Sequence, residues 1–203
     1  MRFSRILGAA LQFTLFFSSS ASAQGADDYP SRPITLVVPF APGGGNDIMA
    51  RLVGERMSKT LGQQVVVENR AGAGGNTGSR QVARSAPDGY TILLAFTGTI
   101  AINPALYVNI GYDPNKELTP IGSIATASSV LVVHPSVPAN NLRELIAYAK
   151  ANPGQLNYAS SGVGTVVHVA TEMLADAAGI DVKQIPYKGT GPAVSDLLGG
   201  TSR

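Results

Sequence analysis

Apolar and polar residues alternate along the first half of the chain in a pattern that predicts strands followed by helices. Continuous apolar runs lie at residues 34–38 and 65–67, and the second is entirely valine. Runs of this kind are typical of strands that are covered on both faces. Between them, residues 48–61 carry apolar side chains at helical spacing, which predicts an amphipathic helix ending at Gly62. A third apolar run at residues 90–96 completes a pattern that favours an α/β fold with a parallel sheet.

The second half of the chain repeats this order of elements. Apolar runs predict three strands, at residues 130–134, 156–159 and 182–186. Helical periodicity predicts three helices, at residues 142–149, 166–178 and 192–198. Asn141 and Glu144 stand at capping-box spacing before the first of these helices. Residues 103–120 contain turn signals without periodicity, which predicts an irregular approach to a second lobe.

Loops rich in glycine or hydroxyl residues follow the predicted strands. The first, residues 39–47, reads Pro-Phe-Ala-Pro-Gly-Gly-Gly-Asn-Asp and leads into a helix that Asn46 or Asp47 is expected to cap. Such a loop leaves the first amide groups of the helix open to an anion, although the glycines also suit a simple tight turn. The other loops are at residues 69–78, 97–99, 160–165 and 187–191. The carboxyl ends of parallel strands meet at one edge of a sheet, so we expect these loops to converge on one crevice.

The start of the chain changes how its charge is interpreted. Arg2 and Arg5 precede an apolar stretch that ends in Ala21-Ser22-Ala23, which predicts a signal peptide over residues 1–23. Cleavage there removes two of the 15 basic residues and none of the 13 acidic ones, which leaves a neutral chain. A neutral chain argues against nucleic acid as a partner. No later apolar segment approaches the ~20 residues that span a bilayer, so we expect a periplasmic protein without direct membrane insertion.

Motifs for catalysis and cofactors fail on composition or spacing. The chain has no cysteine, which excludes disulfides and thiol chemistry. The loop at residues 72–77 has Thr77 where the dinucleotide motif G-x-G-x-x-G requires its last glycine. Ser160 and Ser161 lack the preceding glycine of a G-x-S-x-G nucleophile elbow. We therefore predict no catalytic residue and no cofactor, and keep an exported α/β hydrolase using Ser160 or Ser161 as the alternative.

Two further pairs of residues carry side chains that could bind a metal ion or an anion. His168 and Glu172 are four residues apart on one predicted helix, but no third ligand accompanies them, so no metal site is predicted. Tyr187 and Lys188 combine an aromatic ring and a cation beside two glycines at the end of a strand. That combination suits a small anionic ligand, although Lys188 is equally suited to solvent.

Several segments, taken together, resemble the Bug-type, TctC-like periplasmic receptors, the substrate-binding proteins of tripartite tricarboxylate transporters. The matching segments are residues 29–34, 38–44, 67–70, 72–75, 87–91 and 185–189. The resemblance implies a two-lobed α/β fold of the type II periplasmic-binding-protein kind, each lobe a mostly parallel sheet flanked by helices. Residues 24–122 would form the first lobe and residues 123–203 part of the second. Because family members continue well past the match to residues 196–200, we expect a C-terminally truncated chain with the second lobe and the return to the first incomplete.

The resemblance also implies a function. Such a receptor binds a small carboxylate, here a dicarboxylate, tricarboxylate, amino acid or aromatic acid, and delivers it to membrane transporter subunits without catalysis. The ligand is held largely by backbone amides. The residues expected to contact it are Phe40, Pro42, Gly43, Gly44, Gly45, Asp47, Ala71, Gly72, Ala73, Gly74, Gly75, Thr97, Ser161, Gly162, Thr165, Tyr187 and Lys188.

Overall fold

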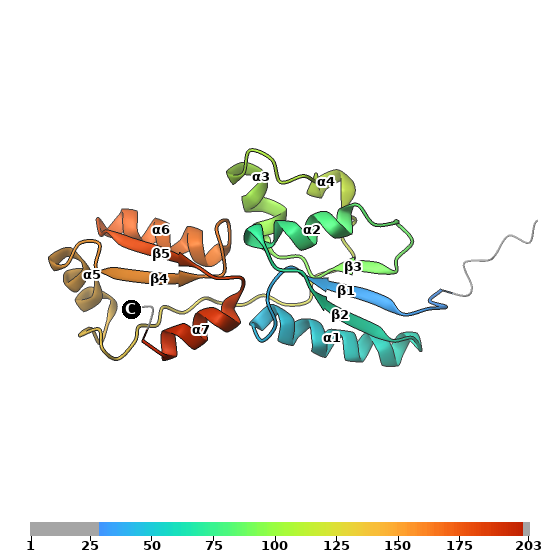
Figure 1. The fold of residues 1–203 in the computed structure, drawn as a ribbon, viewed down its shortest axis with the longest axis horizontal. Coiled ribbons are helices and arrows are strands. Elements are labelled where there is room, and N and C mark those ends of the chain that lie inside the picture. Colours follow the sequence, from blue (N-terminus) through green and yellow to red (C-terminus); the bar gives the residue numbers. More distant parts are fainter. Residues whose placement is uncertain (1–28, 201–203) are drawn as a thin grey trace, which may run out of the picture.

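The described chain forms two lobes that lie side by side along the long axis of the molecule (Figure 1). The structure is a computed structural model, and it describes residues 29–200. The predicted signal peptide, residues 1–23, lies outside the described residues. We use N-terminal lobe for residues 34–117 and C-terminal lobe for residues 142–198. The predicted division at residue 122 falls in the connection between them and remains a prediction.

A parallel sheet of three strands is the base of the N-terminal lobe, as the apolar runs predicted. Its order is β2–β1–β3, with β1 in the centre. The strands are β1 (Ile34–Val38), β2 (Val65–Asn69) and β3 (Thr91–Leu93). Helices α1 (Gly45–Leu61) and α2 (Asn76–Ala83) connect them and lie on opposite sides of β1 (Figure 1). Each strand therefore ends in its glycine- or hydroxyl-rich loop at the same edge of the sheet, which faces the C-terminal lobe.

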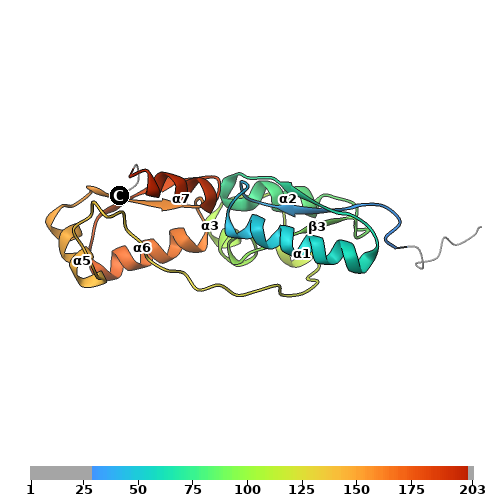
Figure 2. The same ribbon diagram turned by 90° about the horizontal axis from the view of Figure 1, so that it is seen from below.

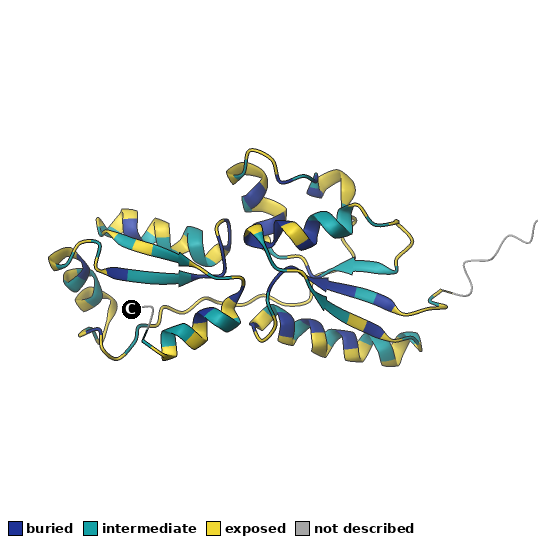
Figure 3. Cartoon of the chain, in the orientation of Figure 1, coloured by how far each residue is buried: buried dark blue, intermediate teal, exposed yellow. Residues whose placement is uncertain are grey.

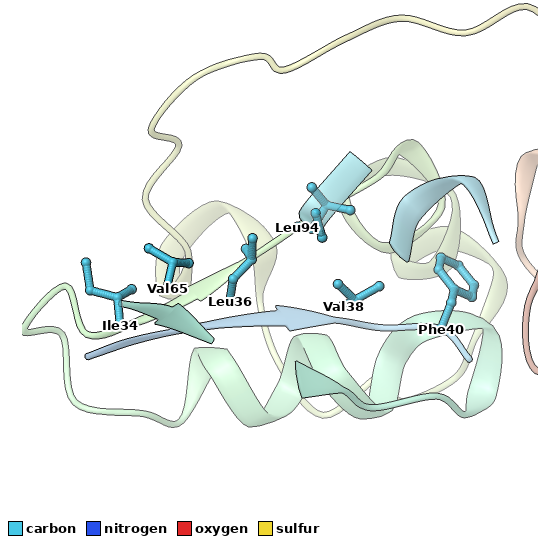
Figure 4. Packing of buried hydrophobic residues seen from close by; sticks show 7 residues of the cluster. Ile34, Leu36, Val38, Phe40, Val65 and Leu94 are labelled. Atoms are coloured by element: carbon cyan, nitrogen blue, oxygen red, sulfur yellow. The ribbon is translucent and has the colours of Figure 1, made fainter. Parts of the chain in front are cut away.

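Apolar side chains from this sheet and from α1 form the larger core of the molecule (Figure 4). Alternate residues of β1 are fully buried, and Ala50 of α1 packs into the same cluster. The buried members are Ile34, Leu36, Val38, Phe40, Ala50, Val65 and Leu94. The burial of β1 within the sheet fixes its carboxyl end, and with it the start of the loop that follows.

Residues 103–120 were predicted to be irregular, and this prediction was wrong in part, because two short helices lie within them. A π-helical turn (Gly98–Ile102) runs into α3 (Asn103–Leu106), and α4 (Pro114–Glu117) follows. Both α3 and α4 have proline within their first two positions, where the missing N–H costs nothing. In α4, Asp113 also caps the helix by accepting a hydrogen bond from the Asn115 amide at 3.0 Å. Proline and Asx signals that suggest turns are thus also the signals that start short helices.

The C-terminal lobe has two parallel strands, β4 (Leu156–Ser160) and β5 (Val182–Pro186). Its helices are α5 (Leu142–Ala151), α6 (Val166–Ala178) and α7 (Thr190–Leu198). The predicted cap at Asn141 is confirmed, because Asn141 Oδ1 accepts from the Glu144 amide at 3.0 Å. The reciprocal bond of a capping box is displaced by one residue, since Glu144 Oε2 accepts from the Asn140 amide at 2.7 Å and not from the Asn141 amide. Within residues 29–200, no helix combines the length and apolar character that crossing a membrane requires.

The connection between the lobes does not contain the strand predicted at residues 130–134. This segment is part of a long extended run that passes along one side of the molecule (Figure 2). Its side chains are largely exposed, and Val130 retains 81% of its accessible surface (Figure 3). Among the described strands, β4 pairs with β5 and neither pairs with this run. An apolar run predicts an extended backbone, but only a pairing partner makes it a strand.

Candidate functional site

Three helices begin where the two lobes meet, and each begins at a glycine (Figure 1). Gly44 caps α1, Gly75 caps α2 and Gly189 caps α7, and none of these helices has a side-chain cap hydrogen bond. By contrast, Thr165 caps α6 through its hydroxyl, which accepts from the His168 amide at 3.4 Å. First-turn amides without a side-chain cap can bind water or an anion, and the helix dipole favours negative charge there. In α2, however, the Asn76 and Thr77 amides already donate to the carbonyls of Ala73 and Gly72.

The loop before α2 has an unusual backbone. Positive φ angles occur at four consecutive residues: 143° at Gly72, 47° at Ala73, 59° at Gly74 and 91° at Gly75. This region is accessible to glycine, whereas an L-residue such as Ala73 is strained there by about 1–2 kcal/mol. At Gly75 a Cβ atom would also lie 2.8 Å from the ring of Phe96. Both the backbone and the packing therefore require glycine at this position.

The loop before α1 already holds an anion, the carboxylate of Asp47. The prediction that Asn46 or Asp47 caps α1 was wrong, since the cap is Gly44 and Asp47 lies in the first turn with 4% of its surface exposed. Its carboxylate accepts hydrogen bonds from the Gly43 amide at 3.0 Å, from Arg51 at 3.0 and 3.1 Å, and from Asn69 Nδ2 at 2.9 Å. The spacing of four residues on one helix permits the pair with Arg51, whereas no local spacing indicates Asn69.

These contacts determine the charge state of Asp47. Burial raises the pKa of the carboxyl, but the hydrogen bonds from Arg51, Gly43 and Asn69 outweigh it, so the pKa lies below its ordinary value. The ionised carboxylate is thus held at this loop, and it would repel a ligand carboxylate placed directly beside it.

The first loop also packs against the C-terminal lobe. A Cβ atom on Gly44 would lie 2.5 Å from the Thr190 hydroxyl, and the Ala41 amide donates to the Lys188 carbonyl at 2.8 Å. Thr190 therefore stands in front of this loop at Gly44, where the sequence predicted an opening for an anion. Gly43 and Gly45, however, have open space where a side chain would begin.

A cavity of about 280 Å³ lies between the second loop and the C-terminal lobe. Both lobes contribute to its lining, and four of the five predicted loops reach it, whereas the loop at residues 97–99 does not. Nine of the residues predicted to contact the ligand line this cavity. They are Phe40, Gly72, Ala73, Gly74, Gly75, Ser161, Gly162, Tyr187 and Lys188.

The other predicted contact residues do not line this cavity. They are Pro42, Gly43, Gly44, Gly45, Asp47, Ala71, Thr97 and Thr165. Thr165 is buried and donates to the Gly162 carbonyl at 2.8 Å, which fixes the loop before α6. Thr97 is exposed at the start of the π-helical turn. Contact of these residues with a ligand remains a prediction.

Three residues that line the cavity were not predicted: Tyr107, Val163 and Pro186. Val163 and Pro186 lie within or beside loops that the pattern had marked, so including every residue of those loops would have found them. Tyr107 follows α3, a helix that the sequence did not predict, and no pattern around it indicates a site.

Lys188 is the charged residue of this lining. No other described residue forms an ion pair with its ammonium group, whereas the neighbouring Tyr187 hydroxyl donates to Asp196 Oδ2 at 2.7 Å. The cavity therefore combines one cation with amide and hydroxyl groups, an arrangement that favours an anionic ligand.

The arrangement around Ser160 does not suit a nucleophile. Its hydroxyl oxygen accepts from the Gly162 amide at 3.2 Å and from Gln184 Nε2 at 2.7 Å. Within residues 29–200, no hydrogen bond joins Ser160 or Ser161 to a histidine. His134 instead contacts Ser136, and His168 contacts the Gly164 amide. Without a base near the hydroxyl, the hydrolase alternative gains no support.

Solved structures place this fold among periplasmic binding proteins. MatC from Rhodopseudomonas palustris, solved with bound malate, is 36% identical with a TM-score of 0.82, over 86% of this chain and 59% of that one. An R. palustris protein solved with adipate is 39% identical with a TM-score of 0.83, over 86% of this chain and 58% of that one. The class of protein defined by the fold is thus a two-lobed α/β binding protein.

Sequence comparison gives the family. Residues 49–203 match the model of the tripartite tricarboxylate transporter family receptor, TctC. Protein BugT of Bordetella pertussis is 41% identical over 98% of this chain. The chain belongs to the TctC family, which is a family of receptors and not of enzymes. The chain spans only part of the length of its relatives and covers 61% of BugT.

Proposed function

We propose that the chain is an extracytoplasmic solute receptor that binds a small organic carboxylate between its lobes and delivers it to the membrane subunits of a tripartite tricarboxylate transporter. Receptors of the TctC family are periplasmic. We infer that residues 1–23 direct export and are cleaved after Ala23, and N-terminal sequencing of the exported protein tests this inference. Intact residues 1–23 in a periplasmic fraction would contradict it.

The Lys188 ammonium carries the proposal. Lys188 is an exposed residue of the cavity lining, and its ammonium has no ion-pair partner among the described residues, so it can pair with a ligand carboxylate. A charge-assisted hydrogen bond to a carboxylate contributes about 1.5–3 kcal/mol.

The size of the cavity limits the ligand. Its volume of about 280 Å³ lies at the small end of ligand pockets, which span roughly 300–1,000 Å³. Malate and adipate, each present in one of the solved relatives, are small dicarboxylates. They are therefore the first compounds to test with this chain.

Calorimetric titration of the exported chain with malate and adipate tests the proposal, with the corresponding diamides as uncharged controls. Lys188→Gln should weaken binding of the dicarboxylate by about tenfold or more, because it removes a charge-assisted bond. Lys183→Gln is the matched control, since Lys183 is exposed on β5 and does not line the cavity.

The outcomes separate two questions. If neither dicarboxylate nor a wider panel of tricarboxylates, amino acids and aromatic acids bound, the receptor proposal would fail. If a carboxylate bound, and Lys188→Gln and Lys183→Gln bound it with the same affinity, the receptor proposal would stand but the role of Lys188 would not.

A further inference from the structure

Tyr107 connects the two lobes through its side chain. It follows α3 of the N-terminal lobe, and its hydroxyl donates to the carbonyl oxygen of Val163 in the C-terminal lobe at 3.0 Å. These residues are 56 positions apart in the sequence. Burial raises the pKa of Tyr107, so the hydroxyl keeps its proton and remains a donor at neutral pH. Both residues also line the cavity.

The Val163 carbonyl lies directly over Gly74. A Cβ atom at Gly74 would overlap the Val163 oxygen and would lie 3.3 Å from the Tyr107 hydroxyl. Asn103 holds Gly74 from below, because its Nδ2 donates to the Gly74 carbonyl at 3.1 Å and to Asn76 Oδ1 at 2.7 Å. The Val163 carbonyl of the C-terminal lobe thus packs against Gly74 and accepts from Tyr107, while Asn103 holds Gly74 in place. We call Gly74, Asn103 and Tyr107 the carbonyl seat.

Docking on the carbonyl seat also has a cost. Asn103 is fully buried, and its Oδ1 has no hydrogen-bond partner in the described part of the chain. Gly164 of the C-terminal lobe covers this oxygen, since a Cβ atom at Gly164 would overlap it. Separation of the lobes would return water to Oδ1, so the closed arrangement gains the Tyr107 bond and loses the hydration of an amide oxygen.

The lobes also meet where the Ala41 amide donates to the Lys188 carbonyl at 2.8 Å and where Thr190 packs against Gly44. Whatever these contacts contribute, loss of the Tyr107 hydrogen bond shifts the ratio of closed to open molecules by the free energy of that bond. The Tyr107 hydroxyl is the part of the carbonyl seat that can be removed without changing the backbone or creating a large cavity.

We propose that Tyr107 is a positioning residue whose hydroxyl holds the loop at residues 161–164 over the cavity and sets how much of the ligand-free protein is closed. The cavity's role as a ligand site rests on the proposed function, but the closure itself does not. It can be measured without any ligand.

The full chain has no cysteine, so two introduced cysteines carry spin labels without background. Gln64→Cys in the N-terminal lobe and Lys150→Cys in α5 are at exposed positions, and double electron–electron resonance reports the distance between them. Tyr107→Phe should reduce the closed-to-open ratio by about tenfold and move the distance distribution to longer values.

Tyr158→Phe is the matched control. It also removes a tyrosine hydroxyl bond, from Tyr158 to Glu172 Oε1 at 2.5 Å, but that bond lies within the C-terminal lobe. The distribution of Tyr158→Phe should match that of the labelled parent. An unchanged distribution in Tyr107→Phe, or the same shift in both variants, would overturn the proposal.

Addition of malate or adipate separates the two proposals. If neither binds, the receptor proposal loses its first test while the ligand-free result still decides the role of Tyr107. If one binds, Tyr107→Phe should raise its dissociation rate by about tenfold and leave the association rate within a factor of about two. Unchanged dissociation would count against the role of Tyr107.

Discussion

The first and second glycine loops of the N-terminal lobe look alike in sequence but lie in different environments. Both follow parallel strands of one sheet and both lead into a helix. The first loop, residues 39–47, is tied to the buried carboxylate of Asp47 and packs against Thr190 of the other lobe. The second, residues 71–75, has four positive φ angles and lines the cavity with four of its five residues.

This difference shows what a run of glycines indicates and what it leaves open. Glycine permits close approach of the backbone to another group, but that group can be protein or ligand. At the first loop the group is the first turn of α7, since a Cβ on Gly44 would lie 3.3 Å from the Gly191 amide nitrogen. At the second loop it is the Phe96 ring on one side and the cavity on the other.

The largest effect should come from removing the anion of the first loop. Asp47→Ala leaves the Gly43 amide and the side chains of Arg51 and Asn69 without their acceptor. We expect a loss of about 2–3 kcal/mol in the free energy of unfolding, because the bonds lost involve a charged group in a buried site. Urea unfolding of the full chain measures it.

Asp113, which is less buried than Asp47, provides the control for this substitution. Asp113→Ala removes the cap of α4 and an ion pair with Lys116, and should cost clearly less than Asp47→Ala. Equal losses for the two variants would mean that the Asp47 network contributes no more than an ordinary helix cap.

A matched pair of glycine substitutions sharpens the comparison further. Gly75→Ala forces an L-residue to a φ of 91° and brings its Cβ to within 2.8 Å of Phe96 and 2.9 Å of Thr99. We expect a loss of about 2 kcal/mol. Gly45→Ala meets no atom within 4 Å at the first helical position of α1, and should change stability by less than about 0.5 kcal/mol. Similar melting temperatures for the two variants would refute this distinction between the loops.

Much of the fold could be predicted from the sequence because local pattern determines it. The buried run at residues 34–38, the helix that ends at Gly62 and the cap at Asn141 each depend on residues close in sequence. The prediction of a strand at residues 130–134 was wrong because a strand needs a second segment to pair with, and the pattern of one segment does not show whether a partner is present.

The candidate site divides in the same way. Gly72–Gly75 and Lys188 line the cavity because strand order fixes where their loops lie. Tyr107 and Asp47 depend instead on partners 56 and 22 residues away, Val163 and Asn69. No local spacing encodes such contacts, so sequence reasoning missed the first and assigned the wrong role to the second.

The pH dependence of stability tests the charge state assigned to the first loop. Because the folded-state pKa of Asp47 is lowered, its stabilising contribution is present above the unfolded-state pKa and is lost as the pH falls through the folded-state value. Between about pH 6 and about pH 3, the wild-type chain should therefore lose more stability than Asp47→Asn, which cannot titrate. Parallel curves of unfolding free energy for the two proteins would show that Asp47 is not ionised against Arg51.

The smallest effect should come from the strained alanine of the second loop. Ala73 has a φ of 47°, and Ala71, two residues earlier, is not among the described residues with positive φ. Ala73→Gly relieves about 1–2 kcal/mol of backbone strain and adds about 0.4–1 kcal/mol of unfolded-chain entropy, so we expect a net gain near 0.5 kcal/mol. Ala71→Gly raises the entropy of the unfolded chain without relieving backbone strain, so its free energy of unfolding should fall by about 0.4–1 kcal/mol. Opposite signs in thermal unfolding would show that the left-handed backbone belongs to residues 72–75, whereas losses in both variants would mean that the loop relaxes around Ala73 and stores no strain.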